Sequence, residues 1–129
     1  MRHLLRDDRG STPVEFVLVG VLLTVLTLGV LQLALAVYVR NVVHDAAVEG
    51  AYYAALADVE TAAGALRARE TVERAVGDGF VEGAAAWESS KLGYDTVSVT
   101  LTTRLPLIGL LGISQGWEVT VHAPVETFD

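Results

Sequence analysis

One uncharged run dominates this sequence and limits what the chain can fold into. From Phe16 to Val39 no residue carries a charge, and most residues are Leu or Val. A helix needs about 20 apolar residues to cross the hydrocarbon core of a bilayer. This 24-residue run is therefore long enough to span a membrane with some tilt, and the remainder of the 129 residues leaves room for one modest domain outside it.

The charges around the run predict its orientation. Arg2, Arg6 and Arg9 precede it, whereas only Arg40 follows it closely, so the positive-inside rule places the N terminus in the cytoplasm. From Asn41 onward 13 Asp and Glu oppose 5 Lys and Arg. An acidic surface of this kind repels phosphate backbones, which argues against nucleic acid as a partner.

The residue inventory argues against catalysis. The chain has no cysteine, which excludes disulfides, thiolate metal sites and thiol nucleophiles. His3, His44 and His122 fall in three different predicted elements, and neither a zinc-binding H-E-x-x-H motif nor a phosphate-binding loop occurs. We therefore expect a protein that is not an enzyme and that needs neither a metal nor a cofactor.

Three fates are open to the run and the residues before it. Ala34-Leu35-Ala36 offers a secretory cleavage pattern, but the apolar run is longer than that of a signal peptide and continues without a helix breaker. A plain signal anchor explains the length of the run, but it gives no role to residues Arg9–Phe16, the junction between the leader and the run. The third possibility is that this junction is itself a processing site.

The junction Arg9-Gly10-Ser11-Thr12-Pro13-Val14-Glu15-Phe16 resembles the processing site of type IV pilin-like proteins. The resemblance implies that a prepilin peptidase cuts after Gly10, which makes Ser11 the first residue and Glu15 the fifth, with Phe16 following. The new α-amino group of Ser11, cationic below a pKa of about 8, could then pair with Glu15 of a neighbouring subunit. Thr12–Glu15 also fits an ordinary capping box, with Thr12 at the N-cap.

The segment after the run makes the resemblance more specific. Residues 38–55 look like the signature of TadE-like proteins, minor pseudopilins of the tight-adherence (Flp pilus) system. The matching residues are Arg40, Asn41, Ala46, Ala47, Glu49, Gly50, Tyr53 and Ala54. The resemblance implies as partners a prepilin peptidase, other pilin-like subunits, an inner-membrane assembly platform and an ATPase.

Beyond the signature the pattern predicts a second helix and then strands. Thr61 could begin a helix that reaches about Val76 or further, with an apolar face continuing through Phe80, Ala84 and Trp87, and Gly77-Asp78-Gly79 as a break or kink. In Thr96–Thr102 and Trp117–Ala123 the odd positions are apolar, which predicts two half-buried strands that pair antiparallel.

The connection between these strands is unusually apolar for a loop. It could fold back onto its own domain, dock on another subunit or dip into the membrane surface. The residues of this possible interaction loop are Leu107, Ile108, Leu110, Leu111 and Ile113.

Together these patterns predict an α+β protein with a long N-terminal transmembrane helix, a second helix and a C-terminal antiparallel hairpin or small sheet. We expect a cytoplasmic leader at 1–10, a stem helix at 11–56 that crosses the membrane at about 16–39, and an extracytoplasmic domain at 57–129. The expected function is that of a pseudopilin-like component of a Tad/Flp-type pilus or related export machine. The alternative is a single-pass, membrane-anchored extracytoplasmic binding module.

Overall fold

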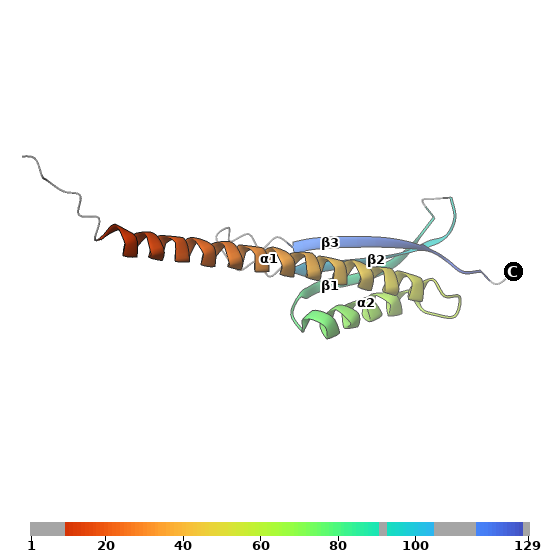
Figure 1. The fold of residues 1–129 in the computed structure, drawn as a ribbon. Coiled ribbons are helices and arrows are strands. Elements are labelled where there is room, and N and C mark those ends of the chain that lie inside the picture. The colour runs from red at the N-terminus through yellow and green to blue at the C-terminus, as the bar shows by residue number, and fades with distance from the viewer. Residues whose placement is uncertain (1–9, 91–92, 105–115, 128–129) are drawn as a thin grey trace, which may run out of the picture. The chain divides into compact units, whose positions relative to one another are not determined.

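The computed structural model describes residues 10–90, 93–104 and 116–127. Two helices precede three strands: α1 (Ser11–Ala54), α2 (Thr61–Val76), β1 (Val81–Ser89), β2 (Thr96–Arg104) and β3 (Gly116–Pro124) (Figure 1). The α+β class predicted from the sequence is confirmed. The chain divides into two compact units, Met1–Ala34 and Leu35–Asp129, so the first part of α1 belongs to one unit and its last part to the other.

The three strands form one antiparallel sheet in the order β1-β2-β3. β2 and β3 pair as their alternation predicts, with Val97 opposite Ala123 and Leu101 opposite Val119. The apolar odd positions therefore share one face of the sheet. On the opposite face the small polar side chains of β2 bond across the ladder, and Thr100 Oγ1 lies 2.6 Å from Thr120 Oγ1.

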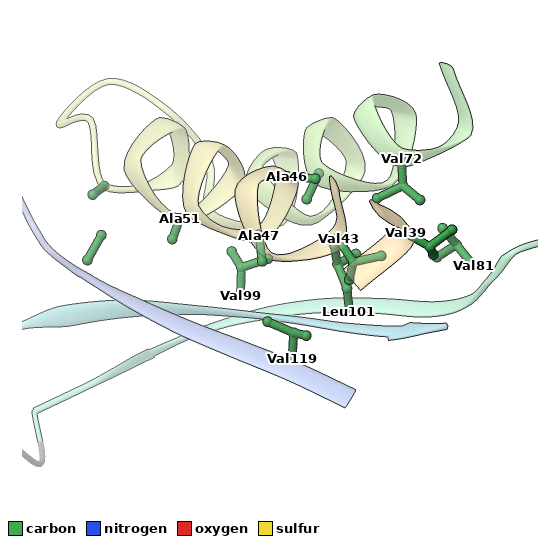
Figure 2. Close-up of a cluster of buried hydrophobic side chains, with 13 residues drawn as sticks. Val39, Val43, Ala46, Ala47, Ala51, Val72, Val81, Val99, Leu101 and Val119 are labelled. Carbon is green, nitrogen blue, oxygen red and sulfur yellow. The ribbon is translucent and has the colours of Figure 1, made fainter. Parts of the chain in front are cut away.

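The core of the second unit lies between this sheet and a layer of two helices. The last part of α1 and the whole of α2 cover one face of the sheet (Figure 1). Figure 2 shows Val99 and Leu101 of β2 meeting Val43 and Ala47 of α1, and all four side chains are fully buried. Most of the helix side chains here are Ala or Val, which lets the helices pack close to the strands.

The expected extension of the second helix is wrong. α2 ends at Val76, and residues 81–89 form the edge strand β1, with Ala84 on the core side and Trp87 directed away from it. Gly77 and Gly79 adopt φ angles of 97° and 92°. Residues with side chains rarely take such angles, so the two glycines end the helix and turn the chain into the sheet.

The start of α1 also differs from the capping-box interpretation. Ser11 already lies inside the helix, so Thr12 is a helical residue and not the N-cap. Pro13 is tolerated because the first backbone N–H groups of a helix have no partner within it. The apolar connection that contains Leu107 and Ile113 lies outside the described residues.

Candidate functional site

The junction residues occupy the first turns of α1. Gly10 immediately precedes the helix and is exposed, and the Ser11 hydroxyl donates a hydrogen bond of 2.7 Å to Glu15 Oε1. The two residues are one helical turn apart, so their side chains lie on one face. Phe16 is 79% exposed at the start of the apolar run. The structure thus places the residues of the expected processing site at an accessible helix start.

The stem that follows is apolar on all sides. Every residue from Ser11 to Leu35 is exposed, and the helix is long and apolar enough to cross a membrane. The hydroxyls of Thr24 and Thr27 donate to the carbonyl oxygens of Gly20 and Leu23, each at 2.8 Å. A helix with so continuous an apolar surface needs lipid or other helices around it, which fits a single-pass membrane anchor.

Two small residues of the expected signature, Gly50 and Ala54, face α2, whereas Ala47 faces the sheet (Figure 2). Ala46, Ala47, Gly50 and Ala54 are all buried. A Cβ atom placed on Gly50 would lie 2.5 Å from the carbonyl oxygen of Gly64 in α2. The helices therefore approach so closely that neither glycine can carry a side chain without a shift of backbone.

Glu49 and Tyr53 of the signature also contact α2, through polar side chains. Arg67 Nε donates to Glu49 Oε1 at 2.9 Å, and the Thr71 hydroxyl donates to Glu49 Oε2 at 3.2 Å. The guanidinium carbon of Arg67 also lies 4.8 Å from the ring centroid of Tyr53. Glu49 and Tyr53 are one turn apart on α1, so both side chains contact Arg67.

Arg40 reaches a different partner. Its guanidinium carbon lies 5.1 Å from the ring centroid of Trp117 at the start of β3, which is within the range of a cation–π interaction. Asn41 is exposed beside it. The structure therefore brings the signature residues to different neighbours: Gly50 contacts α2, Ala47 packs on β2 (Figure 2), and Arg40 contacts β3.

Sequence reasoning missed the residues of α2 and β3 that complete these contacts. Gly64 carries a usable signal, because a glycine inside a helix costs about 1 kcal/mol relative to alanine and its presence indicates close packing. Arg67 and Trp117 carry no such signal, since their partners are far away in the sequence and only the fold brings them together.

Within the described residues the structure offers no obvious catalytic group. Ser98 Oγ lies 2.5 Å from His122 Nδ1, but Ser98 is fully buried in the central strand and a substrate could not reach it. The same ranges hold no cluster of three side chains that could ligate a metal. The Ser98–His122 pair is a cross-strand contact that satisfies a buried hydroxyl.

An apolar helix of this length, followed in the chain by a small α+β domain, fits a protein with a single-pass membrane anchor. The family model described as TadE-like protein matches residues 10–51, so this segment of the chain is similar to that family. This match confirms the resemblance to TadE-like proteins that the sequence indicates. No significant match was found among curated proteins or among solved structures.

Proposed function

We propose that this protein is a pseudopilin-like structural or assembly component of a Tad/Flp-type pilus or a related export machine. The observation that carries the proposal is the family match, which begins at Gly10 and continues through the stem to the residues that contact α2. The matched segment thus contains the exposed junction, the apolar stem and the part of α1 that contacts α2, all in one helix.

In this proposal a prepilin peptidase removes the leader by cutting after Gly10, and the N terminus faces the cytoplasm. The domain that begins after the stem lies on the other side of the membrane. The chain then acts as a substrate of the peptidase and as a partner of other pilin-like stems, an inner-membrane platform and an ATPase. It has no enzymatic activity, metal or cofactor of its own.

Glu15 has a specific role in the proposed assembly. A carboxylate at the edge of the hydrocarbon core is costly unless it is paired. Before cleavage the Ser11 hydroxyl bonds to it. After cleavage the α-amino group of Ser11 in a neighbouring subunit supplies a full positive charge, which favours one register of packing between stems.

The test is the N-terminal sequence and intact mass of the protein from membranes of its native host, with and without the prepilin peptidase. A chain that begins at Ser11 only when the peptidase is present supports the proposal. A chain that begins at Met1 in both strains supports the alternative, a plain membrane-anchored binding module. A chain that begins at Val37 would indicate a secreted domain.

Two glycine substitutions sharpen this test. A Cβ atom on Gly10 would meet nothing within 4 Å, and the same holds for Gly20 in the stem. Gly10→Val should therefore leave the fold unchanged, and a loss of cleavage in this variant would mean that the peptidase does not accept valine at this position. Gly20→Ala, equally unhindered, should leave cleavage unchanged. Normal cleavage of the Gly10→Val chain would contradict the assigned site.

A further inference from the structure

The outer edge of β3 is an open strand edge. β3 pairs with β2 on one side only, because it ends the sheet order β1-β2-β3. Just past the strand, the Val125 N–H donates to the carbonyl oxygen of Asp95 at 3.0 Å. Backbone groups of successive strand residues point to alternate sides, so the odd-numbered residues of β3 bond to β2. The N–H and C=O groups of Glu118, Thr120 and His122 therefore point to the open side.

No described residue pairs with this edge. Residues 10–90, 93–104 and 116–127 supply no hydrogen-bond partner for the outward backbone groups of β3. β3 pairs with β2 over its 9 residues without a bulge, whereas the other edge strand, β1, has a register shift between Val81 and Gly83. β3 also contains no lysine, and its single proline is its last residue. A long, regular edge without such protection is a template for another strand.

A groove beside the edge can receive the side chains of an added strand. It lies between β3 and α1 and has a volume of about 540 Å³. Its lining residues are Val37, Arg40, Asn41 and His44 from α1 and Trp117, Glu118, Val119 and Thr120 from β3. The side chains of Glu118 and Thr120 lie on the opposite face of the sheet, where Thr120 bonds to Thr100, so these two residues border the groove through their backbone. An added strand would direct every second side chain into the groove.

Arg40 sets the charge of the groove. Of the lining side chains on the α1 side of the sheet, only Arg40 carries a full charge, and Val37 and Val119 are apolar. The Arg40 guanidinium carbon lies 5.1 Å from the centroid of the Trp117 ring, and Arg40 forms no ion pair with any described residue. A carboxylate on an added strand would be attracted to this cation, and an ammonium group would be repelled. The groove thus favours a strand with apolar side chains and one acidic side chain on the face toward α1.

The segments of the chain outside the described residues cannot pair along this edge. Residues 105–115 start beside Arg104 and end beside Gly116, which lie opposite each other. A strand from there along β3 to His122 and back would need about 14 residues, more than this segment contains. Residues 91–92 and 128–129 are too short to form a strand. When the run Phe16–Val39 spans the bilayer, residues 1–9 lie on its other side.

A second copy of the chain does not fit the edge either. Symmetric pairing of β3 with β3 of a second copy would be antiparallel. Because α1 packs on the sheet from Val39 onward, the two α1 helices would then point in opposite directions, which a shared membrane orientation forbids. The β1 edge of a second copy has the required direction, but α2 packs on β1 and would meet α1 at the groove. The edge therefore fits an extended segment that carries no helix over it.

We propose that β3 binds an extended segment of another protein as a fourth strand of the sheet, with an acidic side chain of that segment at Arg40. The backbone groups of Glu118, Thr120 and His122 supply the hydrogen bonds, and the groove receives the alternate side chains. The proposal rests on the edge of the sheet and not on a role in a pilus. It can therefore fail while the proposed function stands, and the reverse also holds.

The test uses the full chain in phosphatidylcholine nanodiscs and a labelled nonapeptide in which threonine and valine alternate, with one valine replaced by glutamate. A second peptide carries lysine at that position, and empty nanodiscs correct for binding to lipid. We expect fluorescence anisotropy to show binding of the glutamate peptide about tenfold tighter than binding of the lysine peptide. Equal affinities, or no binding of the glutamate peptide up to about 1 mM, would overturn the proposal.

Hydrogen exchange measured by NMR locates the bound peptide. The amides of Glu118, Thr120 and His122 should exchange at least about tenfold more slowly at saturating glutamate peptide, because they gain hydrogen-bond partners. The amides of Val119 and Val121 already bond to β2, so their exchange should change less. Protection without this alternation would contradict the addition of a strand.

Variants separate the edge from the fold. Thr120→Pro removes an N–H on the open side and no ladder bond to β2, so it should weaken binding at least about tenfold, whereas Thr120→Ala should not. Arg40→Gln should abolish the preference for glutamate over lysine, and Arg74→Gln, on the exposed surface of α2, should preserve it. Circular dichroism verifies that each variant is folded. An unchanged preference in a folded Arg40→Gln chain would overturn the proposal.

Modified peptides give the same test on the unaltered protein. An added strand bonds to β3 through alternate residues. Methylation of all threonine nitrogens or of all valine nitrogens should therefore abolish binding in one of the two peptides and spare the other, and the affected peptide shows the direction of the added strand. Equal effects of the two methylations would contradict the proposal.

Discussion

Gly50 of α1 and Gly64 of α2 face each other, and each leaves room for the carbonyl oxygen of the other. A Cβ atom on Gly50 would also lie 2.7 Å from the Cβ of Ala68. Side chains cannot relieve this crowding, because the obstacles are backbone and a methyl group. The pair therefore fixes how closely the stem helix and α2 can pack.

Replacement of Gly50 by alanine should destabilise the domain. We expect a loss of about 1–3 kcal/mol, the usual cost of overpacking a tight contact. Unfolding by denaturant, followed by Trp87 and Trp117 fluorescence in detergent, would measure it. The control is Gly20→Ala, where nothing lies within 4 Å of the added atom. A Gly50→Ala protein as stable as this control would mean that the helices do not approach as described.

The arginine held by Glu49 and Tyr53 should matter more than an ordinary surface arginine. Arg67 and Glu49 are 46% and 44% exposed, so solvent screens their pairing. We nevertheless expect Arg67→Met to cost about 1 kcal/mol, because the ring contact is lost with the ion pair. Arg74→Met, which removes only a 4.0 Å contact to Glu70, should cost less than about 0.5 kcal/mol.

A double-mutant cycle would apportion this effect. If Glu49→Gln and Arg67→Met act on the same interaction, the loss in the double variant should be smaller than the sum of the two single losses. Strict additivity would indicate that the two side chains do not interact in solution.

Glu15→Ala should impair assembly without affecting the domain. We expect association with other pilin-like subunits to fall about tenfold, equivalent to about 1.4 kcal/mol. The fraction of subunit recovered in purified filaments, or crosslinked to other stems, is the readout. Ser11→Ala is the matched control, since it removes the hydroxyl bonded to Glu15 but preserves the α-amino group after cleavage. Wild-type assembly by the Glu15→Ala protein would count against the proposed pairing.

Leu101→Ala should be the most damaging of these substitutions. Leu101 is fully buried in the central strand, and truncation of such a side chain costs about 2–5 kcal/mol. Leu66→Ala, at a position 59% exposed on α2, should change stability by less than about 0.5 kcal/mol. Denaturant unfolding of both variants would measure the difference. Similar unfolding midpoints would mean that Leu101 is not part of the core.

The parts of the fold that the sequence predicts are those with a strong local pattern. The stem is uncharged over several helical turns, and β2 and β3 alternate cleanly, so period and length suffice to identify them. β1 is different, because its run Ala84-Ala85-Ala86 favours helix when considered alone. It becomes a strand because the open edge of β2 needs backbone partners, and that need arises only in the assembled sheet.

For the candidate site, the sequence likewise predicts the positions of residues within α1 but not the partners that they contact. The junction and the signature lie in one continuous segment, so their spacing along a helix is visible in the sequence. What Glu49, Tyr53 and Arg40 contact is not visible, because Arg67 and Trp117 come from later elements. The contacts depend on how α2 and β3 are placed against α1, which sequence spacing does not define.

The threonines of the stem have a consequence for movement. Thr24 and Thr27 bond to carbonyl oxygens of their own helix, so neither hydroxyl depends on a neighbour. A stem of this kind can exchange lipid chains for protein surfaces, or slide along an adjacent helix, without breaking either bond. Neither lipid nor protein around the stem therefore has to supply a partner for these two hydroxyls.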